Sequence, residues 1–92
     1  MKLLIWGTET CSDCVDVLEY LKGTEVQYKF IELNENIMNL KRFLRLRDKE
    51  NIFDEVKKDG NVGVPAFKLE DGTLTLDWNY VKEEIEKWNQ KQ

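Results

Sequence analysis

The chain has 92 residues and a net charge of −4, with 41% hydrophobic and 35% charged residues. A chain below about 100 residues supports one hydrophobic core, so we expect a single domain spanning residues 1–92. We also expect a monomer. The composition excludes a disordered chain, and the negative charge predicts no binding to nucleic acid or to anionic membranes. The apolar start, Leu3–Trp6, is too short for a signal peptide or a membrane span, which predicts a cytoplasmic protein.

The first half of the chain predicts a strand, a helix, a second strand and a second helix. Leu3–Trp6 is a continuous apolar run, typical of a strand buried on both faces. Residues 14–21 have helical apolar spacing, and Gly23 suits a left-handed C-terminal cap. The alternation over Val26–Leu33 predicts a half-buried strand near a sheet edge, and residues 37–47 predict an amphipathic helix. The expected apolar stripes are Cys14, Val15, Leu18 and Leu21 in the first helix, and Ile37, Leu40, Phe43 and Leu44 in the second.

The second half predicts a short helical piece, a hairpin and a closing helix. Apolar residues within 52–56 suggest the helical piece, and Val64–Leu69 predicts a third strand. Asp71-Gly72 is a hairpin turn signal, with Thr73–Leu76 as the returning strand. Asp77 suits the N-cap of a last helix, whose apolar stripe is Trp78, Val81, Ile85 and Trp88. The order β-α-β-α-β-β-α predicts a four-stranded mixed sheet with helices on both faces, the architecture of the thioredoxin fold.

The two cysteines of the chain, Cys11 and Cys14, form a C-x-x-C pair where the first strand leads into the first helix. At the N-cap, the Cys11 sulfur would face unpaired backbone amides and the positive end of the helix dipole. Both favour the thiolate, which is the nucleophile in disulfide exchange. The spacing lets the Cys14 sulfur reach Cys11 and resolve a mixed disulfide formed there. The pair therefore indicates redox chemistry.

Other roles for the pair stay open. Free cysteines are often buried as small hydrophobic residues, and Cys14 lies on an apolar stripe. A non-catalytic metal or iron-sulfur module would need ligands across a dimer, because the chain has two cysteines and no histidine. A third alternative is a partner-binding domain whose cysteines do not turn over. We expect no metal site and no tightly bound cofactor.

The residues TETCSDC, the order of the elements and the stretch VGVPAF together resemble the glutaredoxin family over almost the whole chain. FLRLRD, FDEVK, GVPAF, EDG and LDW are similar to short bacterial glutaredoxin-related proteins. The resemblance implies an oxidoreductase that reduces protein disulfides or glutathione mixed disulfides, with glutathione as a possible co-substrate. By position, it implies Cys11 as nucleophile, Cys14 as resolving thiol, Pro65 as a cis proline, and Val64 as the residue whose backbone pairs with substrate.

Several positions depart from the family's pattern. Ser12 and Asp13 stand where the family usually has proline and tyrosine between its cysteines. Thr8 replaces a lysine that pairs with a glutathione carboxylate in the family. Leu76 falls in a segment where glycines let the backbone approach glutathione closely, which a leucine side chain prevents. The resemblance therefore predicts an altered glutathione site.

Charged residues near the pair add two further expectations. Glu9, Asp13 and Asp16 oppose negative charge on a sulfur or on incoming glutathione. We hypothesise that Ser12 and Asp13 tune the pair and that Asp13 makes it more reducing, although a carboxylate in a first helical turn also stabilises the helix. The second helix carries the cations Lys41, Arg42, Arg45 and Arg47, with Lys49 just after. Either they form a solvated face, or one of them supplies the contact to a glutathione carboxylate that Thr8 lacks.

Overall fold

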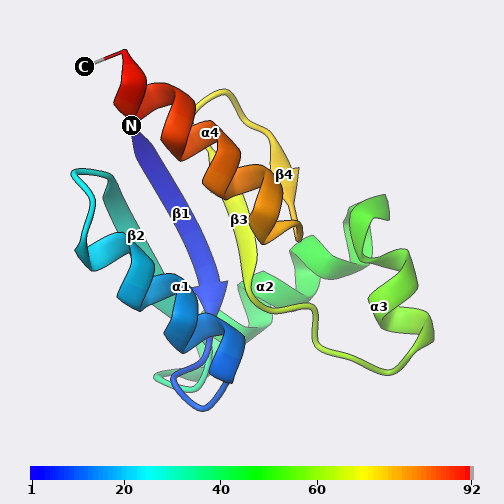
Figure 1. Cartoon of the computed structure of the whole chain (residues 1–92). Helices are drawn as coiled ribbons and strands as arrows, with labels where there is room; N and C mark the ends of the chain where they lie inside the picture. The colour runs from blue at the N-terminus through cyan, green and yellow to red at the C-terminus, as the bar shows by residue number, and fades with distance from the viewer. Residues whose placement is uncertain (92) are drawn as a thin grey trace.

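The computed structural model describes residues 1–91, in which four strands form one mixed sheet between helices (Figure 1). The strand order is β2-β1-β3-β4, with β1 parallel to β2 and antiparallel to β3, and with β4 antiparallel to β3. The predicted order of elements and the mixed sheet are confirmed, and so is the edge position of the second strand. The elements are β1 (Lys2–Gly7), α1 (Ser12–Lys22), β2 (Gln27–Glu32), α2 (Ile37–Lys49), the 3-10 turn η1 (Asn51–Phe53), α3 (Asp54–Lys58), β3 (Ala66–Leu69), β4 (Leu74–Thr75) and α4 (Trp78–Gln90).

Two hydrophobic clusters hold the layers together, one on each face of the sheet. Side chains alternate along a strand, so Leu3 and Ile5 of β1 join one cluster while Leu4 and Trp6 join the other. The first cluster packs against α1 and α4, which lie in front of the sheet in Figure 1, and the second packs against α2 and η1 behind it. The main helical contributors are Val17, Leu21, Val81 and Ile85 in the first cluster, and Phe43 and Phe53 in the second. Among residues 1–91, no helix has both the length and the apolar character that a membrane span requires.

Three positions of the expected helical stripes turn out to be exposed. Val15 of α1 is 41% exposed, and Ile37 and Leu44 of α2 are 61% and 36% exposed. Their places against the sheet are taken by Val17 in α1 and by Leu46 in α2. The expectation was wrong because apolar spacing defines a stripe only to within about one residue on either side. The direction in which a helix crosses the sheet decides which flank is covered.

Helix α1 ends differently from the expectation. Gly23 has φ −87° and ψ 6°, so the predicted left-handed cap is wrong. The amides of Gly23 and Thr24 donate to the carbonyls of Tyr20 and Leu21, at 3.2 and 3.0 Å. These bonds satisfy the last carbonyls through a right-handed turn, so no positive φ is needed.

The strands are shorter than predicted at the hairpin. Strand β3 begins at Ala66, two residues after the expected start, because Pro65 has no N–H to donate to a neighbouring strand. Strand β4 holds only Leu74–Thr75 of the expected Thr73–Leu76. Both ends of the hairpin thus leave backbone outside the sheet, close to the residues that the resemblance assigns to substrate binding.

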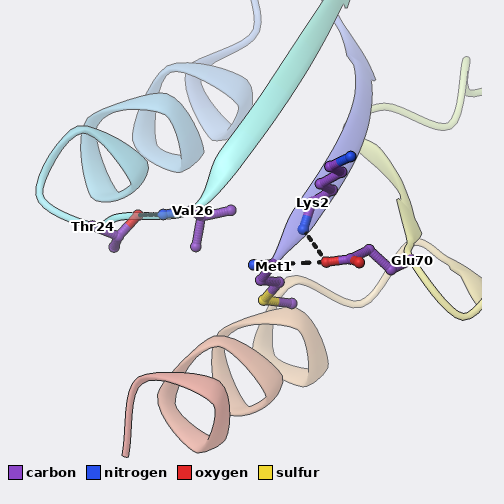
Figure 2. Close-up of polar contacts among 5 residues, drawn as sticks. All are labelled: Met1, Lys2, Thr24, Val26 and Glu70. Atoms are coloured by element: carbon purple, nitrogen blue, oxygen red, sulfur yellow. Dashed lines mark hydrogen bonds and ion pairs between the residues drawn. The ribbon is translucent and has the colours of Figure 1, made fainter. Parts of the chain in front are cut away.

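Polar contacts fix the ends of the strands (Figure 2). The Glu70 carboxylate, just after β3, accepts a hydrogen bond from the backbone N–H of Lys2 and lies 3.6 Å from the amino group of Met1. The Thr24 hydroxyl accepts from the Val26 N–H at 3.3 Å, just before β2. The Glu70 contacts tie the start of β1 to the end of β3, and the Thr24 contact fixes the turn that leads into β2.

Gly63 offers a test of how tightly the loop before β3 is packed. Its φ is +97°, and a Cβ there would lie 2.9 Å from Cδ1 of Phe53. Gly72 also has a positive φ, of +90°, but a Cβ there would meet no atom within 4 Å. We therefore expect Gly63→Ala to lower the free energy of unfolding by about 1–3 kcal/mol more than Gly72→Ala does, measured by urea denaturation. Equal losses would contradict this packing.

Candidate functional site

Cys11 is the N-cap residue of α1, as predicted. Strand β1 ends at Gly7, and the chain turns so that the Cys11 N–H donates to the Thr8 carbonyl at 3.2 Å. Cys11 has extended φ and ψ of −88° and 118°, and its Sγ accepts from the N–H of Cys14 at 3.3 Å. The sulfur is partly exposed and lies at the positive end of an 11-residue helix. This position stabilises negative charge on sulfur.

Cys14 lies one turn further along α1 and is fully buried, with 0% of its surface exposed. Its sulfur packs directly against β1, because a Cβ at Gly7 would lie 2.7 Å from Cys14 Sγ and 3.0 Å from Cε1 of Phe30. A larger residue at position 7 would therefore have to push the sulfur aside. Sequence reasoning missed this contact. The signal in the sequence was a glycine four residues before Cys11, whose role depends on the distance between β1 and α1.

The surroundings of Cys14 keep it protonated. The pKa of the Cys14 thiol is raised from its usual 9.0 to about 12. Burial is the largest cause, and a hydrogen bond and charge from Cys11 also contribute to the rise. A backbone hydrogen bond from Thr8 opposes these effects, and the charge of Asp13 adds the smallest contribution to the rise in pKa. At neutral pH, Cys14 is therefore a buried thiol, whereas Cys11 is partly exposed.

This difference predicts selective alkylation of the reduced protein. A pKa of about 12 leaves roughly a thousandfold less thiolate at neutral pH than a pKa of 9.0. We expect iodoacetamide to modify Cys11 first and to leave Cys14 unmodified until the pH is raised or the protein is unfolded. Peptide mass spectrometry after short labelling would measure the order. Equal labelling of both cysteines in the folded protein would be incompatible with a buried Cys14.

A groove of about 580 Å³ lies between α1 and the start of α4, and its lining includes Asp13, which stands between the two cysteines in the chain, but neither cysteine. It contains two residues that the sequence assigned to the site, Asp13 and Pro65, whereas Ser12 is exposed at the start of α1 and Val64 packs at the border of the second cluster. The Val64-Pro65 peptide bond is cis, as the resemblance implied. Sequence reasoning missed the contributions of Tyr20, Trp78 and Lys82. The complete lining is Asp13, Asp16, Val17, Tyr20, Pro65, Leu76, Asp77, Trp78, Asn79 and Lys82.

The cations of the second helix lie away from this groove. Arg42 lines a separate hollow with Trp6 and Phe30, and the Arg47 guanidinium donates to the Asn61 carbonyl. The cation of the groove is instead Lys82 of α4, whose Nζ lies 5.9 Å from the centre of the Trp78 ring. Helix α4 therefore supplies the positive charge that the sequence suggested α2 could provide.

Metal ligands do not gather around the pair in the part of the chain that the structure describes. Within residues 1–91, no three side chains of the types Cys, Asp, Glu or His lie close enough together to hold a metal ion. A metal or a cluster on Cys11 and Cys14 would need further ligands from outside this chain.

Comparison with known proteins finds similarity to a bacterial protein over most of the chain. The chain is 36% identical over 81 residues to an uncharacterized protein of Haemophilus influenzae, and the alignment covers 88% of this chain and 94% of that protein. No protein-family model matches the chain, and no solved structure matches it. The similarity thus extends over most of the elements described above.

Proposed function

The chain belongs to the family of this Haemophilus influenzae protein, and we propose that it is a thiol–disulfide oxidoreductase of the glutaredoxin type with a thioredoxin-like fold. It reduces protein disulfides or glutathione mixed disulfides, in the cytoplasm and without a tightly bound cofactor. The observation that carries the proposal is the unequal environment of the two sulfurs. Cys11 Sγ accepts a hydrogen bond from a backbone amide at a helix N-terminus, whereas Cys14 is buried and protonated one turn away.

The environments assign the two sulfurs their order in the reaction. The Cys11 thiolate attacks one sulfur of a substrate disulfide, forms a mixed disulfide with that half and releases the other half as a thiolate. Cys14 then attacks Cys11 Sγ, which forms the Cys11–Cys14 disulfide and releases the second half of the substrate. Two electrons and two protons pass from the cysteine pair to the substrate, which leaves as two thiols. Two molecules of a low-molecular-weight thiol return the pair to the reduced form and leave joined as a disulfide.

The high pKa of Cys14 suits its later role. Two of the causes that raise this pKa come from Cys11, through a hydrogen bond and through charge. Both weaken when Cys11 enters a mixed disulfide, because its sulfur then carries no charge and accepts a hydrogen bond from the Cys14 thiol less well. The Cys14 thiol becomes more acidic at the moment when its thiolate is needed, and its proton passes to the departing thiolate.

The backbone at Val64 suits an extended substrate. Strand β3 starts at Ala66, and among residues 1–91 the Val64 backbone N–H donates no hydrogen bond. A substrate strand that pairs with Val64 would lie along the groove that Pro65 and Asp13 both line. The four-stranded order and the helices on both faces of the sheet support the thioredoxin-like interpretation of the fold.

A redox titration followed by mass spectrometry tests the proposal. The protein is equilibrated in glutathione buffers from roughly −300 to −150 mV, the range of thiol redox proteins, and free thiols are then alkylated. We expect the loss of two hydrogen atoms at one defined potential and a Cys11–Cys14 disulfide in the peptide map. Cys11→Ser serves as the control, in which this disulfide cannot form. Absence of the disulfide over the whole range, or a brown iron-sulfur colour after anaerobic purification, would overturn the proposal.

A further inference from the structure

The groove between α1 and α4 has an apolar floor. The Trp78 ring stacks on Phe67 at 5.4 Å and meets Tyr20 edge to face at 5.4 Å. Phe67 is fully buried in the first cluster, so these contacts hold the Trp78 ring of the floor against the sheet. With Val17, Pro65 and Leu76, the aromatic rings give the groove an apolar floor. Its volume of about 580 Å³ is enough for one or two side chains of a bound peptide.

The rim of this groove is acidic. Asp13 and Asp16 of α1 and Asp77 at the start of α4 line it and are exposed, and Lys82 is the one cation in its lining. The ammonium of Lys82 is drawn over the Trp78 ring, so it compensates only part of the negative charge.

A second hollow extends the acidic surface to the other side of Cys11. Glu9, Glu32 and Glu35 line it, and Glu9 and Thr10 of its lining immediately precede Cys11 in the chain. The Glu32 carboxylate is held by the N–H groups of Glu9 and Asn34, at 2.6 and 2.8 Å, which fixes its place beside the loop. Residues 8–16 contain no lysine or arginine. A partner that approaches Cys11 therefore meets carboxylates of both hollows, Asp13 from the groove and Glu9 from the second hollow.

We propose that this groove selects disulfide partners that carry lysine or arginine beside their cysteine, and that it disfavours glutathione and other acidic partners. The inference rests on the proposed function and specifies its substrate class as a cationic protein segment. The stem of a lysine or arginine packs on the apolar floor formed by Pro65 and Trp78, while its charged end reaches the carboxylates of Asp16 and Asp77. Charge of one sign along a cleft also raises the association rate of partners with the opposite charge, by about tenfold or more at low ionic strength.

Reduction of three model disulfides tests this selection. Three peptides share one sequence around an internal disulfide and differ only in two flanking residues, which are lysine, glutamine or glutamate. Initial rates of reduction give kcat/KM for each peptide at low and at high salt. We expect the lysine peptide to exceed the glutamate peptide by about tenfold or more at low salt and by much less at high salt, because salt screens the charges.

Matched variants identify the groove as the source of the preference. Asp16→Asn combined with Asp77→Asn should reduce the ratio between the lysine and glutamate peptides several-fold, and asparagine retains the N-cap of α4. The control, Glu83→Gln combined with Glu86→Gln, removes two exposed carboxylates of α4 that lie outside the groove and should leave the ratio unchanged. Equal rates on all three peptides, or equal effects of both double variants, would overturn the charge selection alone. Failure to reduce any of the peptides would overturn the proposed function, and with it this inference.

Discussion

Replacing Cys14 with serine is expected to stop the dithiol cycle and to trap the substrate on Cys11. The Cys11 sulfur stays at the N-cap in this variant, so it still attacks a disulfide. The mixed disulfide then accumulates because the variant has no second cysteine to attack Cys11 Sγ. We expect the turnover of a peptide disulfide to fall by about 10²-fold or more, as is typical when a residue that makes and breaks covalent bonds is removed. Intact-mass measurement would detect the trapped adduct.

The reciprocal variant separates the two roles. Cys11→Ser should lose turnover and should form no adduct, because Cys14 stays buried in this variant and burial is the largest cause of its raised pKa. If the adduct instead accumulated on Cys14 in Cys11→Ser, the roles assigned to the two sulfurs would be reversed. If Cys14→Ser turned over as fast as the parent protein, the resolving step would not involve Cys14.

Replacing Phe43 with alanine is expected to cause the largest loss of stability. Phe43 is fully buried in α2, with its ring 6.3 Å from Trp6 and 5.6 Å from Phe53, which it meets edge to face. Removing a buried ring of this kind costs about 3–5 kcal/mol, which is a large part of the 5–15 kcal/mol that stabilises a typical domain. Chemical denaturation would measure the change in the free energy of unfolding.

The neighbouring residue in the same helix is the matched control. Leu44 is 36% exposed and belongs to neither hydrophobic cluster, so Leu44→Ala should cost less than about 1 kcal/mol. Similar losses in Phe43→Ala and Leu44→Ala would show that α2 packs on the sheet through a different face from the one described.

Local sequence patterns were sufficient for most of the elements. The apolar run of β1, the Asp71-Gly72 turn and the Asp77 cap all depend on interactions within a few residues. The Asp77 carboxylate accepts the Tyr80 N–H at 3.2 Å, which is a contact that three-residue spacing alone predicts. The N-cap position of Cys11 could be predicted for the same reason, since it follows from where the helix begins.

Contacts between distant segments could not be obtained in this way. The exposed Val15 and Leu44 show that spacing fixes a helical stripe only approximately, and the sheet decides which side of it is buried. The missed role of Gly7 depends on the distance between β1 and α1, and the groove depends on Pro65 and Trp78 meeting across more than ten residues of chain.

The sequence by itself therefore determined the order of the elements, the cysteine pair at a helix start and the acidic residues around it, because each of these is a property of neighbouring residues. Only the tertiary structure decided that Cys14 is buried while Cys11 is accessible, and that Lys82 rather than an α2 cation enters the groove. Burial and electrostatic surroundings arise when α1 and α4 pack on one face of the sheet, and no local pattern specifies that packing.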